Sequence, residues 1–233
     1  MNSQIGYANP YTVAAAQPSE RALFIRRTYL HLAAAIAAFV GLEFYLFNAP
    51  WAQSLAAAML STSWLLVLGA FIVVSIVADR WARSDASIGK QYLGLGLFVV
   101  AEALIFLPIL LLAVHSGHGD AIPQAAAVTG CLFAALTFTA FFTRKDFSFL
   151  RSFIMIGGFS ALGIIVVGSL AGFTLGTWFS GAMILVAAGS ILYTTSQIIH
   201  QYRPDQHVAA ALSLFSSVAL LFWYVLRLFM SRD

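Results

Sequence analysis

Seven apolar segments occupy most of the 233-residue sequence, and each is about as long as a membrane span. A helix needs ~20 predominantly apolar residues to cross the hydrocarbon core of a bilayer. The segments cover residues 28–47, 60–78, 92–114, 123–143, 149–171, 177–199 and 208–229. The connections between them are short and leave no room for a domain outside the membrane. The sequence therefore predicts an all-α integral membrane protein built as a seven-transmembrane-helix bundle.

The composition excludes an ordinary soluble protein. Hydrophobic residues make up 61% and charged residues only 9% of the chain, and the mean hydropathy is +0.89. A soluble domain carries roughly 25% charged residues. The single cysteine, Cys131, excludes a disulfide framework and a cysteine metal site. The sequence contains no nucleophile with its base, phosphate loop or redox motif, so we expect neither an enzyme nor a resident cofactor.

The first 20 residues are polar, rich in turn-forming residues and without helical periodicity. We expect them to form a flexible cytoplasmic tail, followed by a single seven-span transmembrane domain over residues 21–233. A basic region leading into an apolar one, which a cleavable signal peptide requires, is not evident.

Lysine and arginine residues fall almost entirely on one side of the predicted spans. Most of the twelve precede the first span or lie in the loops after the second, fourth and sixth spans: Arg21, Arg26, Arg27, Arg80, Arg83, Lys90, Arg144, Lys145, Arg151 and Arg203. Only Arg227 and Arg232 fall on the other side. Short loops rich in Lys and Arg stay in the cytoplasm. We expect a cytoplasmic N-terminus and an external C-terminus. The basic excess therefore needs no nucleic-acid partner.

Two polar stretches interrupt the last two apolar segments. Residues 194–197 read Thr-Thr-Ser-Gln, and residues 213–217 include three serines. Because only a short polar turn (residues 200–207) joins these segments, their helices must be antiparallel, with the polar stretches at similar depth. Polar side chains within hydrocarbon face protein or water rather than lipid. Function is therefore expected first between these two helices.

Two acidic residues remain inside the predicted spans. Glu102 lies about 10 residues into the third span, or ~15 Å at 1.5 Å per residue, which is near the bilayer midplane. Glu43 lies in the outer half of the first span, closer to water. A carboxyl group within a span must be protonated, paired or in contact with water, and no Lys or Arg lies at the depth of Glu102. Both are ion-path candidates. Pro108, which should kink the helix beyond Glu102, favours a cavity beside it.

A loop on the external side carries His115, His118 and Asp120. This spacing could hold a divalent metal. The glycines at 117 and 119 leave the turn flexible and no third strong ligand is fixed, so a solvated loop is the simpler interpretation.

Several groups of residues carry a resemblance to a known family. The run Ile191-Leu192-Tyr193, the polar quartet after it and the Ala-Ala-Leu-Ser-Leu run at residues 210–214 resemble the C-terminal signature of the Bax inhibitor-1 (transmembrane Bax-inhibitor-motif) family. The turn at residues 143–150, the start of the first span at residues 24–29 and the region after Leu107 are also similar. The chain after its tail thus resembles a bacterial-type member, and this resemblance implies a place in the bacterial inner membrane.

The resemblance implies a bundle of six helices around the C-terminal one. It also implies a proton-sensitive calcium leak, in which two aspartates of the last two helices share a proton. These aspartates correspond to Thr194 and Ser217 here, so the family's pH sensor is expected to be missing. A simpler interpretation is that the two hydroxyl groups join the helices by a hydrogen bond.

Two hypotheses for function follow. The first is a cation leak pathway through the bundle, with calcium as the transported ion and Glu102 as the intramembrane acid. The second is a non-conducting modulator of membrane proteases or other membrane machinery, which acts through its tail and lateral surface. The lipid bilayer is a partner in both.

The asymmetry of Lys and Arg yields a first prediction about topology. A reporter enzyme that works only outside the cytoplasmic membrane, fused after Asp233, should be active, because seven crossings place the C-terminus outside. A reporter that is active only in the cytoplasm should be silent there. The reverse pattern would contradict the seven-span orientation.

Overall fold

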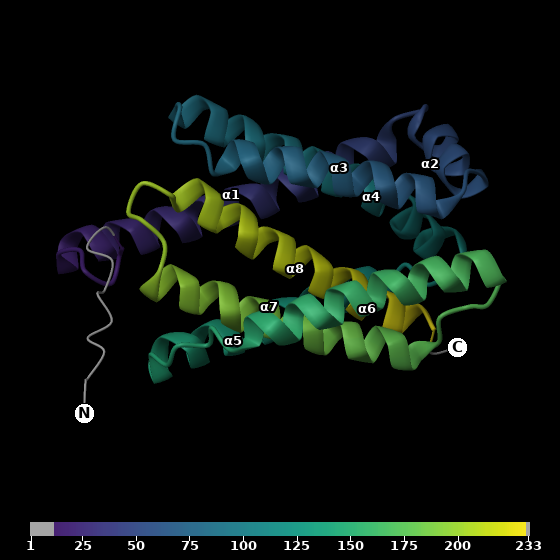
Figure 1. Cartoon of the computed structure of the whole chain (residues 1–233). Helices are drawn as coiled ribbons and strands as arrows, with labels where there is room; N and C mark the ends of the chain where they lie inside the picture. Colours follow the sequence, from purple (N-terminus) through teal and green to yellow (C-terminus); the bar gives the residue numbers. More distant parts are fainter. Residues whose placement is uncertain (1–11, 232–233) are drawn as a thin grey trace.

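The computed structural model describes residues 12–231, and every regular element in that range is an α-helix. Figure 1 shows the helices, which are α1 (Pro18–Asn48), α2 (Ala52–Ser61), α3 (Trp64–Ala82), α4 (Ile88–His115), α5 (Ala121–Thr143), α6 (Leu150–Ala171), α7 (Thr177–His200) and α8 (His207–Met230). All but α2 are long and apolar enough to cross a membrane. The predicted seven-span, all-α architecture is confirmed.

The ends of the helices follow from local sequence. The helix α1 begins at Pro18, whose fixed φ suits the first turn. The side chain of Ser87 caps α4 by accepting a hydrogen bond from the backbone N–H of Lys90, at 3.2 Å. Gly172 ends α6 with a φ of 72°, in the left-handed region that glycine adopts without strain. The helix α4 runs unbroken through Pro108.

Two features differ from the sequence-based expectation. The helix α2 was not predicted; its 10 residues span only ~15 Å, too short to cross a membrane, and it buries Ala52 and Ala56. The tail expected over residues 1–20 lies partly outside the described residues. The structure corrects this expectation for residues 12–20, because Val13 is buried and its N–H donates to the Tyr202 carbonyl at 2.8 Å. Pro18 already begins α1.

The helix α8 lies at the centre of the bundle. It contacts α1, α3, α4, α5 and α7, while α6 packs mainly against α7. Figure 1 shows α8 passing between the α3–α4 side of the molecule and the side formed by α5, α6 and α7. The last helix, α8, is therefore the central one, as expected. The helix α6 differs from the expected ring of six because it packs mainly against α7 rather than α8.

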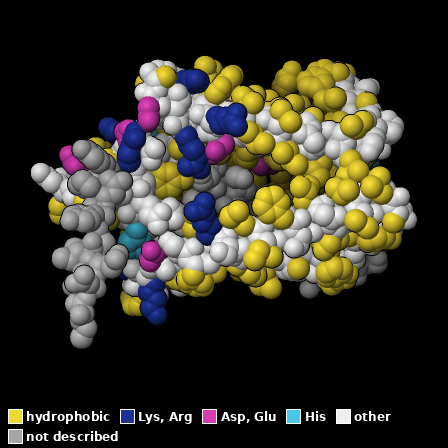
Figure 2. Space-filling model, viewed as in Figure 1, with side chains coloured by type: hydrophobic (Ala, Val, Ile, Leu, Met, Phe, Trp, Pro, Cys, Tyr) yellow, Lys and Arg dark blue, Asp and Glu magenta, His cyan; other side chains and the backbone are white. Residues whose placement is uncertain are grey.

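Basic side chains gather at one end of the bundle, which we call the basic end. This end holds the start of α1 and the loops α3–α4, α5–α6 and α7–α8. Figure 2 shows Lys and Arg side chains concentrated there, while hydrophobic side chains cover much of the rest of that face. The pattern expected from the positive-inside rule is thus present in space.

The helix α4 packs closely against α3 at Gly94. A Cβ at residue 94 would lie 2.5 Å from the carbonyl oxygen of Ala78 and 2.5 Å from the backbone nitrogen of Ala82. Only glycine allows the two backbones to approach so closely.

A second prediction concerns this contact. Replacing Gly94 by Ala should lower the free energy of unfolding by about 1–3 kcal/mol, because the backbones must separate. Gly96, two residues along the same helix and exposed, would place a Cβ in open space, so Gly96→Ala is the matched control. Denaturant unfolding of the purified protein in detergent measures both. Equal effects would contradict the close packing.

Candidate functional site

The polar stretches of α7 and α8 meet at a cavity of about 290 Å³ near the basic end, which we call the basic-end cavity. Its lining comes from the end of α3, the end of α7, the α7–α8 turn and α8: Arg83, Tyr193, Thr194, Gln197, Gln201, Tyr202, Gln206 and Ser213. The predicted meeting of the two polar stretches is therefore confirmed. These side chains avoid lipid by facing one another.

Ser213 is the focus of the polar contacts in this cavity. Its Oγ accepts hydrogen bonds from the Tyr202 hydroxyl and from Nη2 of Arg83, each at 3.0 Å. Nε of Arg83 also donates to both carboxylate oxygens of Asp79, at 2.8 and 2.9 Å. Burial opposes the charge on Arg83, but the neighbouring Tyr202 and Asp79 raise the pKa of its guanidinium. Asp79 thus compensates the positive charge of Arg83, which contacts α8 at Ser213.

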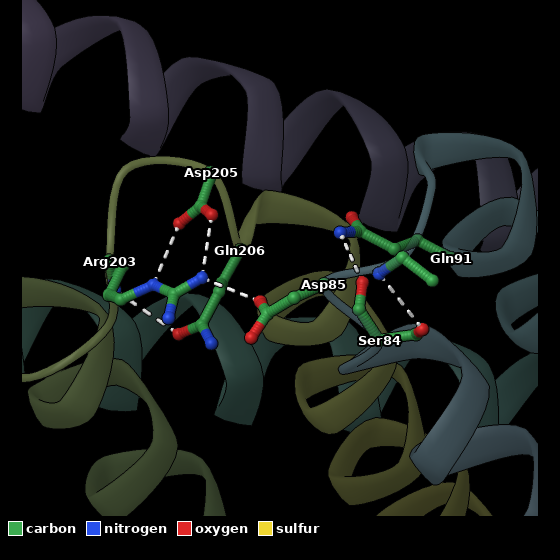
Figure 3. A network of polar contacts seen from close by, with 7 residues as sticks. Ser84, Asp85, Gln91, Arg203, Asp205 and Gln206 are labelled. Carbon is green, nitrogen blue, oxygen red and sulfur yellow. Dashed lines mark hydrogen bonds and ion pairs between the residues drawn. The ribbon is translucent and has the colours of Figure 1, made fainter.

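A group of ion pairs ties together the loops beside this cavity. Nη2 of Arg203, in the α7–α8 turn, lies 2.6 Å from Asp85 of the α3–α4 loop and 2.7 Å from Asp205 (Figure 3). The hydrogen bond from Arg203 holds the pKa of the Asp205 carboxyl below its usual range. Exposed ion pairs contribute little to stability, so this network mainly fixes the position of the turn.

Thr194 and Ser217, the positions that match the family's aspartate pair, are both buried. The Ser217 hydroxyl donates to the carbonyl of Ser213 on its own helix, at 3.0 Å. Thr194 lines the basic-end cavity instead. No hydrogen bond joins these two side chains within residues 12–231, so the expected bond between the helices was wrong. A serine inside a helix commonly bonds to a carbonyl of the preceding turn, and that local bond is the one formed.

A second and larger cavity, of about 660 Å³, lies toward the other end of α8; we call it the far-end cavity. It lies among α3, α4, α6 and α8 and is mostly apolar, with Trp64, Phe71, Phe106 and Trp223 among its walls. Figure 2 shows this face of the molecule hollowed between α3 and α6, with an acidic side chain deep in the hollow. Glu102 is the one acidic residue in the cavity's lining.

The two intramembrane acids have different surroundings. The side chain of Glu102 lines the far-end cavity although the residue is only 6% exposed. None of the described residues gives its carboxyl group a hydrogen bond or an ion pair. Glu43 is 7% exposed and lines neither cavity, and both its oxygens are buried without a hydrogen-bond partner. The cavity expected beside Glu102 is present, and Glu43 is the sealed acid of the two.

The two cavities approach each other along α8. Ser213 lines the basic-end cavity and Ser216 lines the far-end cavity. Ser216 lies three positions after Ser213, which corresponds to ~4.5 Å along the helix axis. About one turn of α8 therefore separates the two cavities, one near the basic end and the other toward the opposite end of α8.

The loop between α4 and α5 does not bring together a metal site. One ring nitrogen of His115 bonds to the Leu111 carbonyl at 2.7 Å, and Nδ1 of His118 lies 3.0 Å from the Ser116 hydroxyl. Within residues 12–231 no group of three His, Cys, Asp or Glu side chains could hold a metal ion.

Sequence reasoning missed three members of this region. The sequence marks Arg83 only as a basic residue on the cytoplasmic side and Tyr202 only as part of a turn. In the structure both donate hydrogen bonds to Ser213. Arg227 was counted only as an external charge, but it lines the far-end cavity and donates to the Leu175 carbonyl at 3.0 Å. The available signal was that Arg227 lies inside the predicted span 208–229, close to its end, where a charged side chain needs a polar partner.

The fold is that of a polytopic membrane protein: seven long apolar helices form a bundle, and polar side chains gather along the central helix α8. The model of one family, described as "Inhibitor of apoptosis-promoting Bax1", matches residues 21–233. The chain belongs to this family, which confirms the resemblance seen in its motifs.

Curated relatives agree with this assignment. The chain is 30% identical over 162 residues to an uncharacterized protein of Pseudomonas aeruginosa, with 68% of each protein covered. It is 32% identical over 133 residues to the Escherichia coli "Modulator of FtsH protease YccA", covering 54% of this chain and 58% of that protein. It is 28% identical over 228 residues to "Bax inhibitor 1" of Schizosaccharomyces pombe, covering 95% of this chain and 81% of that protein.

Proposed function

We propose that the protein provides a regulated cation pathway along α8, with calcium as its ion. The observation that carries the proposal is the placement of two cavities end to end, divided by a single turn of helix between Ser213 and Ser216. A pathway of this kind needs water on both sides of a short barrier. The division at one turn of α8 corresponds to a closed state.

The side chains along this route support a cation rather than an anion. Glu102 places an unpaired carboxyl in the wall of the far-end cavity. The positive charge of Arg83 in the other cavity is balanced by Asp79. Hydroxyl and carboxyl oxygens are the ligands that calcium accepts. By the positive-inside rule the basic end faces the cytoplasm, so ions would leave the far-end cavity past Ser213 toward the cytoplasm.

A third prediction tests the role of Glu102. Calcium flux into liposomes that hold the purified protein should fall at least several-fold in Glu102→Gln, because the cavity loses its only carboxyl. Glu43→Gln is the matched control, since it removes an equally buried acid that lines neither cavity, and its flux should stay at the wild-type level. Unchanged flux in Glu102→Gln, or equal losses in both variants, would contradict the proposed route.

A fourth prediction concerns the absence of the aspartate pair. Thr194 and Ser217 carry no titratable group, so flux should show no sigmoidal transition that depends on them between pH 5 and 8. If the two residues face each other, aspartates placed at both positions should introduce one, because two nearby carboxylates raise one pKa between them. The single variants Thr194→Asp and Ser217→Asp serve as controls. A wild-type transition abolished by Thr194→Ala would show that the sensor has been misplaced.

The second candidate function is modulation of a membrane protease. The similarity to the Escherichia coli modulator of FtsH favours it, and such a role requires only the lateral surface and the N-terminal segment. Adding the purified protein to a membrane-reconstituted FtsH should then change the rate of substrate degradation equally for wild type and Glu102→Gln. Calcium flux in liposomes together with an unchanged rate of degradation by FtsH would contradict the modulator function and support the cation pathway.

A further inference from the structure

The far-end cavity combines features that a purely aqueous ion path does not require. Its volume of about 660 Å³ lies within the range of cavities that hold drug-sized molecules. Apart from a few polar side chains, its walls are apolar. At its inner part lies the Glu102 carboxyl, more than nine-tenths buried and without a hydrogen-bonding or ionic partner among the described residues.

Aromatic rings form part of the wall of the cavity that Glu102 lines. The rings of Trp64 and Trp223 stack with their centroids 6.0 Å apart, and Trp223 meets Phe106 edge to face at 5.0 Å. All three line the cavity. The faces of such rings attract cations, and the attraction grows when water is removed. An aromatic wall beside a buried acid therefore favours a cation that carries apolar surface.

The position of the cavity gives such a molecule a way in from the bilayer. The walls contributed by α3 and α6 flank the hollow visible in Figure 2, and hydrophobic side chains surround the hollow on that face. A hydrated calcium ion would not enter by this side, whereas a molecule dissolved in the membrane would.

We propose that the far-end cavity binds membrane-permeant organic cations, with the cationic centre at Glu102 and the apolar groups against the aromatic wall. The proposal goes beyond the cation pathway because it needs only the cavity and its carboxyl, and no conduction. Arg227, the other charge in the lining, lies ~16 Å from Ser216 along α8 and is bonded to the Leu175 carbonyl. Of the described residues in the lining, Glu102 is therefore the one anionic side chain, and Arg227 is the one cationic side chain.

The test uses two probes of nearly identical shape and opposite charge, tetraphenylphosphonium and tetraphenylborate. Equilibrium dialysis of the full-length protein in nanodiscs, with empty nanodiscs subtracting partition into lipid, should give saturable phosphonium binding. Because the chain has five tryptophans, the part of the fluorescence quenching that is lost in Trp223→Phe reports contact with the aromatic wall. Glu102→Gln should weaken phosphonium binding about tenfold or more, because the charge that holds the cation is lost.

Two further variants keep the test decisive. Glu102→Asp retains the charge and should bind within a few-fold of wild type, which separates loss of charge from a folding defect. Glu43→Gln removes a buried acid outside the cavity and should bind like wild type. Tetraphenylborate should bind more weakly than the phosphonium to wild type and lose nothing in Glu102→Gln. Equal binding of the two probes, or phosphonium binding that survives Glu102→Gln, would overturn the proposal.

Calcium flux distinguishes this proposal from the proposed pathway. Flux that depends on Glu102 without phosphonium binding would leave the pathway and remove the organic-cation site. Phosphonium binding lost in Glu102→Gln, together with no calcium flux in wild type, would do the opposite. If both hold, phosphonium should inhibit the flux, since the two cations would occupy the same cavity.

Discussion

The cost of exposing a polar group to hydrocarbon organises this molecule. Each span must satisfy its own backbone and turn its polar side chains toward protein or water. The helix α8 meets this constraint by lying at the centre of the bundle, where its serines face α7, the basic end and the two cavities. The remaining spans can then present apolar surface to lipid. The candidate site is therefore a consequence of where the bundle can accommodate polar side chains.

Features governed by local chemistry could be predicted from the sequence. Span length and the distribution of Lys and Arg determine the seven helices and the basic end, and the short turn between α7 and α8 places residues 194–197 beside Ser213. Features that depend on competition between several possible contacts could not be predicted from the sequence. The Ser217 hydroxyl had a carbonyl within its own helix, so the bond expected with Thr194 does not form. The helix α2 was missed because its ten residues, seven of them apolar, adjoin the predicted span 60–78 and resemble its edge.

Glu43 and Glu102 show how far residue type alone can lead. Both are single acids inside apolar helices, and both are more than nine-tenths buried. They differ in what lies in front of the carboxyl: Glu102 meets the far-end cavity, whereas the oxygens of Glu43 are enclosed without a partner. The helix that carries each acid does not determine this difference; the gap between α3 and α6 does.

The proposed pathway requires that water reaches α8 from both sides of the turn between Ser213 and Ser216. In a Cys131→Ser background, single cysteines at Gln197 and Ser216 can be exposed to a membrane-impermeant thiol reagent from either side of oriented liposomes. The account predicts that Gln197→Cys reacts only from the basic end and Ser216→Cys only from the opposite end. A cysteine at Leu185, which is 66% exposed on the lipid-facing surface, should react from neither side. An unreactive Ser216→Cys, or a Ser216→Cys that reacts from the basic end alone, would contradict the account.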